Sequence, residues 1–459
     1  MAFPDGSIVS TAFNPSLVAA IQDRTLSRTF RDALFPRILY RMEALPELWP
    51  VNLGANQTFT RTGLIEPTTR PLDPNTDPDD ATYDIEQWEA TAAQYGRSIP
   101  TSMPTSYVSL ASQYLRNMHQ LGLNSGQSMN RLFRDKLFNA YVGGNTVTTA
   151  AALITATTIT VANLTGFTTN LFDGRQTVVS AANPLPITIP ALAQSVNVIG
   201  FTPAVGTDPI HGGTLTLDAG LSGALPSRSA ILAVNRSRLI YSGNAGNRVD
   251  DITPAKQFAL VDVRRAVSQL RFDNVPPHED GTYHCHLDPV SELQIFGDNE
   301  FQRLNQSIPD YIHYRRFAVA HLLNTTFYRN TEAPTTSTCS QNPKIGFTTG
   351  FELINPAGVV IHRPIFTGMG AQEEKYLDEN RYISDAGVQG KIGEFAIVNM
   401  GIQVMTERIR LILRAPLDKL QQVTSVSWSW SGDAPIPSDA TALTSPAVFK
   451  RSVIVCHGE

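Results

Sequence analysis

The sequence predicts an α+β protein that carries a small all-β domain as an insertion. Two strand-like segments near the N-terminus enclose a polar, proline-rich stretch, and a long helical pattern follows them. The composition then changes sharply, because residues 145–235 are rich in Thr, Val, Ala and Ile and almost free of charge. A helix, a strand and a second helix come next, before several alternating strand patterns. A chain of 459 residues is long enough for two or three domains.

Residues 1–54 are expected to form an N-terminal arm and helices. One helical face is indicated by apolar residues at regular spacing, and Pro46 is expected to end that pattern. The residues of this face are Leu26, Phe30, Leu34 and Ile38.

Residues 55–100 are expected to form an extended β-hairpin. NQTFTRTGLI and ATYDIEQWEA alternate as strands do, and EPTTRPLDPNTDPDD lies between them. This tip has several prolines and acids and little to bury, and an isolated two-stranded hairpin is marginal in water. The hairpin is therefore expected to lie on its own body or on a neighbouring molecule.

Residues 101–144 are expected to be helical, with a break marked by Gly122 and Gly126 and an end at Gly143–Gly144. The second helical segment has one apolar face, made of Met129, Leu132, Phe133, Leu137, Ala140 and Tyr141. Short strand patterns separated by Gly, Pro and Asn then fill residues 145–235 and predict a small sandwich or barrel. The helical patterns on both sides of this segment indicate an insertion into one host fold.

Residues 236–401 are expected to form mainly an α/β domain. Thr253 and Pro254 predict the start of a helix, TYHCHL predicts a strand, and Asp288–Pro289 predicts the start of a second helix. Residues 402–459 are expected to be strands. Their apolar positions alternate with polar ones at Ile409, Leu411 and Leu413 and again at Val426, Trp428 and Trp430.

The composition argues against two classes of partner. The net charge of −5 and the absence of a Lys/Arg run are not typical of a nucleic-acid binder. No signal-peptide pattern and no run of about 18 apolar residues is present, so we expect a soluble chain made in a cytosol, without a membrane partner. The three widely spaced cysteines offer no local pair for a disulfide framework.

The segment PPHEDGTYHCHLDP is the clearest candidate for metal chemistry. His284 and His286 lie two apart on a predicted strand and therefore face the same side. HEDGTYH lacks the HExxH spacing, and its prolines and glycine forbid the helix that this motif needs. GxSxG, Walker A and GxGxxG motifs are also missing. We expect no enzyme activity, cofactor or metal, with His284 and His286 as the ligand candidates should a metal bind.

Three segments resemble the major capsid (coat) proteins of tailed bacteriophages, which have the Hong Kong 97-type fold. They are DGTYHCHLDPVSELQIF, RLILRAPLDKLQQVTSVSWSWSGDAPIP and FKRSVIV. The resemblance implies that residues 55–100 are the extended hairpin called the E-loop and that residues 101–144 hold the spine helix of the P-domain. It also implies that residues 236–401 are mainly the A-domain and that residues 402–459 are the C-terminal strands of the P-domain. Residues 145–235 depart from the minimal fold.

The resemblance implies a structural subunit that self-assembles into pentamers and hexamers of an icosahedral phage head around double-stranded DNA. The virion is the implied location, after assembly in the cytoplasm of a host bacterium. Its partners would be other copies of the chain, a separate scaffolding protein, a portal and a decoration protein on the insertion, with packaged DNA bound only non-specifically. Two alternatives stay open. They are a β-rich tail, decoration or adhesion module centred on residues 145–235, and a metal-dependent hydrolase that uses His284 and His286.

Contacts between subunits are expected on the hairpin and on an arginine row of one C-terminal strand. Arginines on one strand face most often pair with carboxylates of a neighbouring element. The acids of the hairpin tip lack the pattern of an EF-hand and are expected to be solvated. The candidate contact residues are Phe59, Arg61, Arg70, Asp77, Asp79, Asp80, Tyr83, Trp88, Arg408, Arg410 and Arg414.

Overall fold

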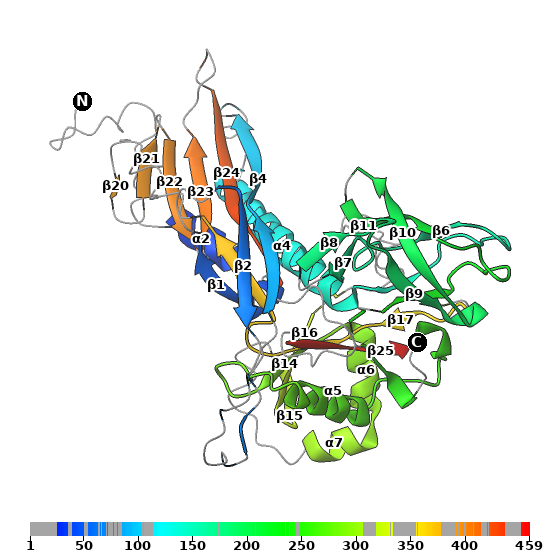
Figure 1. The fold of residues 1–459 in the computed structure, drawn as a ribbon. Helices are drawn as coiled ribbons and strands as arrows, with labels where there is room; N and C mark the ends of the chain where they lie inside the picture. The colour runs from blue at the N-terminus through cyan, green and yellow to red at the C-terminus, as the bar shows by residue number, and fades with distance from the viewer. Residues whose placement is uncertain are drawn as a thin grey trace, which may run out of the picture. The chain divides into compact units, whose positions relative to one another are not determined.

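The computed structural model divides the chain into two compact units, each built from three stretches (Figure 1). The first unit holds Met1–Gln57, Glu89–Arg134 and Glu373–Pro435, and the second holds Thr58–Trp88, Asp135–Gln372 and Ile436–Glu459. The structure describes residues 25–34, 39–49, 54–62, 65, 67–69, 71, 77, 80, 85–102, 104, 113–172, 175–206, 208–234, 236–237, 239–244, 248–305, 318–330, 332–333, 355, 357–377, 391–392, 395–398, 401–406, 408–414, 420, 422–436 and 451–459.

An eight-stranded sheet organises the described part of the first unit. Its strands follow the order β1-β19-β24-β23-β22-β21-β20, and β4 pairs with β24 (Figure 1). Their bounds are β1 Ala44–Leu48, β4 Ala93–Ser102, β19 Gln372–Tyr376, β20 Lys391–Ile392, β21 Phe395–Val398, β22 Gly401–Thr406, β23 Ile409–Arg414 and β24 Val423–Asp433.

Strands β23 and β24 confirm the alternation that the sequence predicts. Leu411 lies opposite Trp428 and Leu413 lies opposite Val426 in the antiparallel ladder. All four side chains are buried, so one face of the sheet forms an apolar layer.

Helix α4 (Gln113–Val142) packs on this layer through its first-unit residues. The ring of Phe133 meets Trp430 edge-on at 5.9 Å, and the indole N–H of Trp428 donates to the side-chain oxygen of Asn124 at 3.1 Å. The helix runs unbroken for 30 residues, so the predicted break at Gly122 and Gly126 is wrong.

Gly122 serves a close approach between two helices rather than a break. A Cβ at this position would lie 2.7 Å from the carbonyl oxygen of Phe30 and 2.9 Å from the Cβ of Ala33, both on α2 (Thr25–Leu34). A glycine is therefore needed for the backbones to come this close. No described helix is long and apolar enough to cross a membrane.

The helical pattern of the N-terminal segment ends earlier than predicted. Phe30 and Leu34 are buried on α2 as expected, whereas Ile38 lies outside the described residues. A 3₁₀ helix η3 (Tyr40–Glu43) and strand β1 follow. Pro46 lies within β1 at the edge of the sheet, where a missing N–H removes no ladder hydrogen bond.

Two strands of the hairpin are confirmed as predicted. Strand β2 (Asn56–Thr62) pairs with β3 (Ile85–Thr91). Of the tip between them, the structure describes only single positions and short pieces, among which Asp77 and Asp80 are exposed.

A six-stranded antiparallel sheet occupies most of residues 145–235, in the second unit, with the order β5-β12-β9-β10-β11-β6. A two-stranded sheet, β7-β8, accompanies it, and a shared apolar core includes Ile187, Val198, Leu215 and Ile231. The β-rich character is therefore as predicted, while the status of an inserted domain stays a prediction. The bounds are β5 Asn145–Val147, β6 Thr158–Val161, β7 Thr169–Phe172, β8 Arg175–Val178, β9 Leu185–Ile189, β10 Gln194–Val205, β11 Asp208–Leu217 and β12 Ala230–Ala233.

A mixed seven-stranded sheet with the order β13-β25-β18-β14-β16-β15, and β17 on β25, also belongs to the second unit. Its central strand β14 runs parallel to β16 and antiparallel to β18. Three helices flank the sheet in sequence, namely α5 Leu260–Phe272, α6 Pro289–Gly297 and α7 Asn299–Asn305. The strand bounds are β13 Leu239–Tyr241, β14 Tyr283–Leu287, β15 Ala318–Leu322, β16 Thr325–Arg329, β17 Ile361–His362, β18 Ile365–Thr367 and β25 Ser452–Gly458.

Helix α5 begins at Leu260, so the start predicted at Thr253 and Pro254 is wrong. The backbone N–H of Leu260 donates to the carboxylate of Asp298 at 2.9 Å, and that of Phe258 donates to Gln294 at 2.8 Å. Side chains distant in sequence thus accept N–H groups at the start of the helix, and within the helix the Asp262 carboxylate accepts from the Ala259 N–H at 3.3 Å.

The C-terminal strands do not stay in one sheet. Strands β22 to β24 belong to the first unit, whereas β25 joins the seven-stranded sheet of the second unit. Grouping residues 402–459 in one sheet is therefore wrong. Every residue of β25 is buried, so this strand needs cover on both faces and neighbours on both sides.

Candidate functional site

His284 and His286, the metal-ligand candidates, lie on the same face of β14, as predicted. The ring of Tyr328 meets His284 edge-on at 4.9 Å and stacks on His286 at 5.7 Å. Cys285 points to the other side and belongs to the apolar core of the α/β sheet.

His284 is held by residues of the preceding loop. Its Nε2 lies 3.0 Å from the carboxylate of Asp280, and its ring stacks on His278 at 3.9 Å. Burial by itself would raise the pKa of Asp280, but hydrogen bonds from His284 and the Thr282 N–H lower it below the ordinary value. The structure therefore brings Asp280, His278 and His284 into one stacked and hydrogen-bonded cluster.

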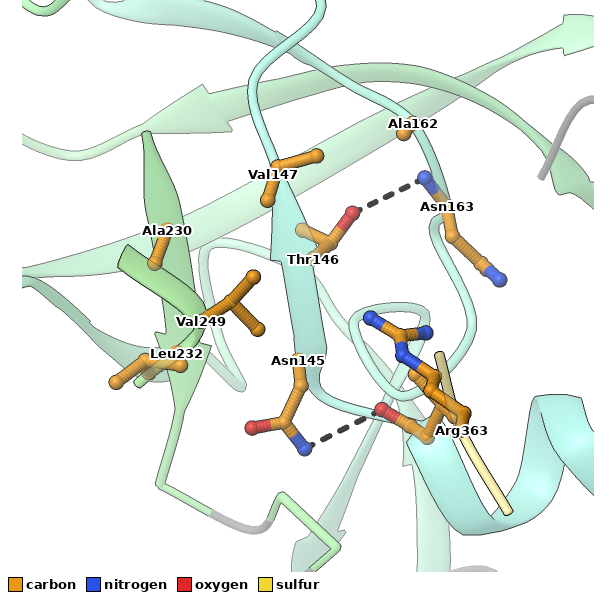
Figure 2. A pocket seen from close by; sticks show the side chains of 10 residues that line it. Asn145, Thr146, Val147, Ala162, Asn163, Ala230, Leu232, Val249 and Arg363 are labelled. Carbon is orange, nitrogen blue, oxygen red and sulfur yellow. Dashed lines mark hydrogen bonds between the residues drawn. The ribbon is translucent and has the colours of Figure 1, made fainter. Parts of the chain in front are cut away.

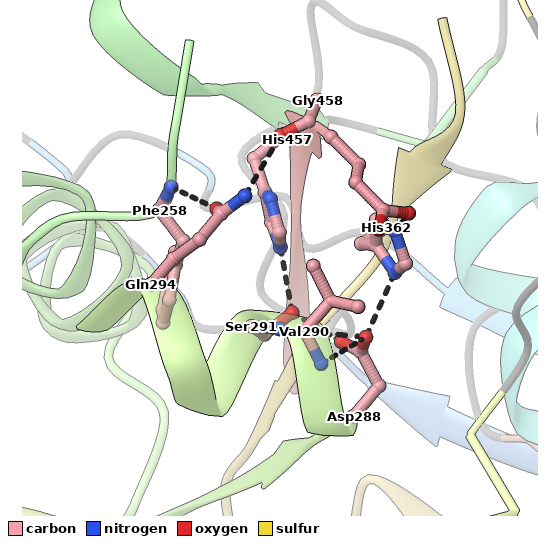
Figure 3. A network of polar contacts seen from close by, with 9 residues as sticks. Phe258, Asp288, Val290, Ser291, Gln294, His362, His457 and Gly458 are labelled. Carbon is pink, nitrogen blue, oxygen red and sulfur yellow. Dashed lines mark hydrogen bonds and ion pairs between the residues drawn. The ribbon is translucent and has the colours of Figure 1, made fainter. Parts of the chain in front are cut away.

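A second polar network surrounds the end of β25, and sequence reasoning missed it (Figure 3). Asp288 accepts from the N–H groups of Val290 and Ser291 at 3.2 and 3.4 Å and so caps α6. The hydroxyl of Ser291 contacts Asp288 and also lies 2.6 Å from Nε2 of His457. We name Asp288, Ser291, His362, His457 and Glu459 the C-terminal network.

His362 connects the network to the last residue described. Its Nδ1 lies 2.7 Å from Oδ2 of Asp288, and its Nε2 lies 3.0 Å from Oε2 of Glu459. The rings of His362 and His457 stack at 5.3 Å. Gln294 completes the attachment, since its amide donates to the carbonyl of Gly458 at 3.0 Å.

The two histidines of the network have opposite pKa shifts. Burial would lower the pKa of His362, but the carboxylates of Asp288 and Glu459 raise it above the ordinary value. Burial lowers the pKa of His457 to about 4, and the neighbouring His362 adds to this effect. Burial would raise the pKa of Asp288, but contacts with His362 and Ser291 lower it. At neutral pH, Asp288 is therefore an anion and His457 is neutral.

These protonation states fix the direction of the hydrogen bonds. An ionised carboxylate only accepts, so the Ser291 hydroxyl donates to Asp288. Its oxygen then accepts from Nε2–H of His457, which defines the tautomer of that imidazole.

The combination of Ser, His and Asp does not have the geometry of a nucleophilic triad. In a triad the imidazole accepts the serine proton, and the carboxylate orients the imidazole. Here Asp288 contacts the serine itself, and a histidine with a pKa of about 4 is a weak base at neutral pH. Ser291 and His457 are fully buried, so the arrangement serves to attach β25 to the start of α6.

The structure describes the side chains of two of the three arginines in the row, Arg408 and Arg410. Arg408 pairs with Glu374 at 3.1 Å and lies over the ring of Tyr376 at 5.7 Å, which confirms the predicted ion pairing for this residue. The Nε of Arg410 donates to the hydroxyl of Ser429 at 3.0 Å. The backbone of Arg414 pairs with Gly401 and Ser425, and its side chain lies outside the described residues.

Glu374, the partner of Arg408, contacts further residues of the first unit. It is fully buried and also pairs with the buried Arg41 at 2.6 Å, while the indole N–H of Trp430 donates to it at 3.3 Å. A carboxylate with two arginines and an indole donor is well compensated for its loss of water.

The hairpin contributes one aromatic pair. Phe59 of β2 stacks on Trp88 of β3 at 6.0 Å. Trp88 is 4% exposed, so it packs within the chain and is not free to contact a neighbour. Asp77 and Asp80 are exposed, whereas Arg70, Asp79, Tyr83 and the side chain of Arg61 lie outside the described residues.

A small cavity in the second unit lies between the end of α4, β5, β12 and Arg363 (Figure 2). The Asn163 N–H donates to the hydroxyl of Thr146 at 3.1 Å on its wall. Asn145 donates to the carbonyl of Ser237 at 3.0 Å and so fixes the chain where it leaves β12.

Comparison with solved structures finds capsids of several bacteriophages that are similar to this chain. No family model matches the sequence, and no curated protein is significantly similar to it. The capsid asymmetric unit of cyanophage Pam1 is 10% identical with a TM-score of 0.49, covering 93% of this chain and 92% of that chain. The capsid of Helicobacter pylori bacteriophage KHP30 is 9% identical with a TM-score of 0.47, covering 90% and 87%. The capsid of Ralstonia phage GP4 is 11% identical with a TM-score of 0.45, covering 91% and 87%.

Proposed function

We propose that this chain is the major capsid protein of a tailed bacteriophage, a structural subunit with the Hong Kong 97-type fold. It self-assembles into the pentamers and hexamers of an icosahedral head that encloses double-stranded DNA. The observation that carries the proposal is the order of elements. The hairpin β2–β3 comes first, then the 30-residue helix α4, the mixed sheet with α5 to α7, and the strands β22 to β24. This order agrees with the order of parts that the sequence resemblance implies.

The exposed surface of the hairpin region supports assembly. Asn56, Thr58 and Thr60 of β2 are exposed, and so are most residues of β4, which pairs only with β24 among the described strands. An open sheet edge and the exposed positions of β2 invite pairing with another chain. Heterologous contacts of this kind generate closed rings when the rotation between subunits closes.

The partners follow from this function. Other copies of the chain are the main partners, and a separate scaffolding protein and a portal direct assembly. Residues 145–235 are the candidate surface for a decoration protein on the finished head. The net charge of −5 suits a shell that holds DNA only non-specifically. The protein is then located in the virion, after assembly in the bacterial cytoplasm.

The test is the size of the purified full-length chain. We expect sedimentation and negative-stain microscopy to show rings of five or six subunits or closed shells. Monomers or trimers at every concentration would contradict the proposal and favour the β-rich tail or decoration module.

A further inference from the structure

The small cavity of the second unit contains one charged side chain. Its volume is about 10 Å³, enough for a single water-sized group. The guanidinium of Arg363 lies at its wall (Figure 2). The other lining residues are Val142, Asn145, Thr146, Val147, Ala162, Asn163, Ala230, Leu232 and Val249.

Arg363 is buried without a compensating carboxylate among the described residues. Its side chain is 7% exposed, and its Nε has no hydrogen-bond partner there. None of the ion pairs between described residues includes it. A buried cation without a counter-charge is strongly unfavourable, so an anion bound beside Arg363 would stabilise the folded chain.

The ionisable groups near Arg363 do not supply the negative charge that would balance it. Burial raises the pKa of Tyr241 and of Cys456, so both are neutral at physiological pH. The Cys456 thiol is a hydrogen-bond partner of Arg363, and Arg236 adds a second positive charge near Tyr241. Asp250 accepts from the Ala230 N–H at 3.3 Å, and the charged groups that act on it are Arg248 and Asp251 rather than Arg363.

The remaining polar groups of the wall are hydrogen-bond donors. Thr146 accepts from the Asn163 N–H through its oxygen, which leaves its hydroxyl hydrogen unused among the described residues. The amide of Asn163 uses one N–H on the side chain of Asn139 at 3.0 Å and has a second N–H available. A guanidinium, a hydroxyl and an amide donor around a small space favour an anion.

We propose that this cavity is a binding site for one small monovalent anion of the size of chloride. Arg363 supplies the charge, and Thr146 and Asn163 supply neutral donors. One arginine balances a single negative charge, so a monovalent anion suits this site better than the doubly charged phosphate or sulfate. Because Arg363 follows β17 and Thr146 lies on β5, the bound anion stabilises the attachment of the β-rich segment to the mixed sheet.

The test measures thermal unfolding of the full-length chain while chloride replaces sulfate at constant ionic strength. Sulfate is the more stabilising salt through its general effect on protein surfaces, so replacement alone would lower Tm. A ligand that binds only the folded state raises Tm. If chloride binds in the cavity, we therefore expect Tm to rise by roughly 2 °C at low chloride and then to level off. A chlorine NMR line that broadens with protein and narrows on addition of bromide is the second readout. A monotonic fall in Tm together with an unbroadened line would overturn the proposal.

Arg363→Gln removes the charge, and we expect this variant to lose both the chloride-dependent rise in Tm and the line broadening. Arg264→Gln is the matched control, because Arg264 is a surface arginine paired with the exposed Glu300 at 3.0 Å. It should respond to chloride as the wild type does. An equal response of Arg363→Gln and wild type would assign the effect to another site. If Arg363→Gln does not fold, the sulfate–chloride exchange and the bromide competition on the wild type decide the proposal alone.

Discussion

The imidazole of His362 contacts the carboxylate of Asp288 at 2.7 Å, and the two side chains are only 0% and 2% exposed. The pair therefore joins β17 to the first turn of α6 by a charge interaction that water hardly screens. Glu459 contacts the other side of the same imidazole. His362 thus holds the start of α6 and the end of β25 together.

The free energy of unfolding should decrease as the pH rises above about 6.5, because His362 then loses its proton. Its pKa is raised in the folded state, so its contribution is complete below the unfolded value of about 6.5 and is lost as pH rises through the folded pKa. We expect urea unfolding to show a decline in the free energy of unfolding above pH 6.5 that is absent in His362→Gln. His119→Gln, at an exposed position of α4, should keep the decline. Parallel pH profiles of wild type and His362→Gln would contradict this assignment.

Stability should also fall on the acid side because of His457. Its folded pKa of about 4 lies below the ordinary value, so the unfolded chain binds a proton first as the pH falls from about 6.5 to 4. The loss is on the order of 3 kcal/mol at the lower end. His457→Phe keeps the ring stacked on Phe258 and cannot titrate, so we expect a flatter acid profile. At neutral pH it should be less stable by about 1 kcal/mol, because Ser291 loses a donor. An acid profile as steep as that of the wild type would exclude His457 as the cause.

Glu374 should contribute more to stability than any exposed carboxylate of its sheet. Glu374→Gln leaves the buried Arg41 without its charge partner, and we expect a loss of about 3–5 kcal/mol in urea unfolding. Glu47→Gln is the matched control. It removes a carboxylate that is 59% exposed and contacts Lys375, and its loss should stay below about 1 kcal/mol. Equal losses would show that Glu374 is no more important than a surface ion pair.

The close approach of α2 and α4 can be tested at Gly122. Alanine favours a helix over glycine by about 1 kcal/mol. Here its Cβ would lie 2.7 Å from a backbone oxygen of Phe30, so we expect Gly122→Ala to destabilise by roughly 1–3 kcal/mol. Gly297→Ala, on α6 with no atom within 4 Å of the added Cβ, should be neutral or stabilising. A stabilised Gly122→Ala would mean that the two helices separate easily.

Elements with a strong local pattern were predictable from the sequence. The alternation of Ile409 and Leu411 with Arg408 and Arg410, and of Trp428 and Trp430 with serines, predicts β23 and β24 because a strand repeats every two residues. Asp288–Pro289 predicts the start of α6 because the cap and the fixed proline φ act within one turn.

Features that depend on distant residues were not predictable in this way. The start of α5 depends on Asp298 and Gln294, which lie beyond the helix in sequence. The C-terminal network joins Ser291 to His457, 166 positions apart, and Arg41 reaches Glu374 across 333 positions. His362 and His457 stand alone in the sequence, without a spacing that marks a site. His284 and His286 are close in sequence, and the contacts described for them are with Asp280, His278 and Tyr328.

The hairpin should be required for assembly and dispensable for folding. Residues 66–80 lie between β2 and β3, and the two exposed acids described there, Asp77 and Asp80, have no contribution to a core. We therefore expect deletion of residues 66–80 to leave circular dichroism and the urea midpoint of the isolated chain nearly unchanged. Negative-stain microscopy should show no stable shells, because the hairpin no longer reaches a neighbouring subunit.

Replacing the same residues with a Gly/Ser linker of equal length is the control, because it keeps the length of the hairpin and removes its side chains. Shells with the linker but not with the deletion would mean that length alone suffices, whereas normal shells from the deletion itself would refute the role of the hairpin.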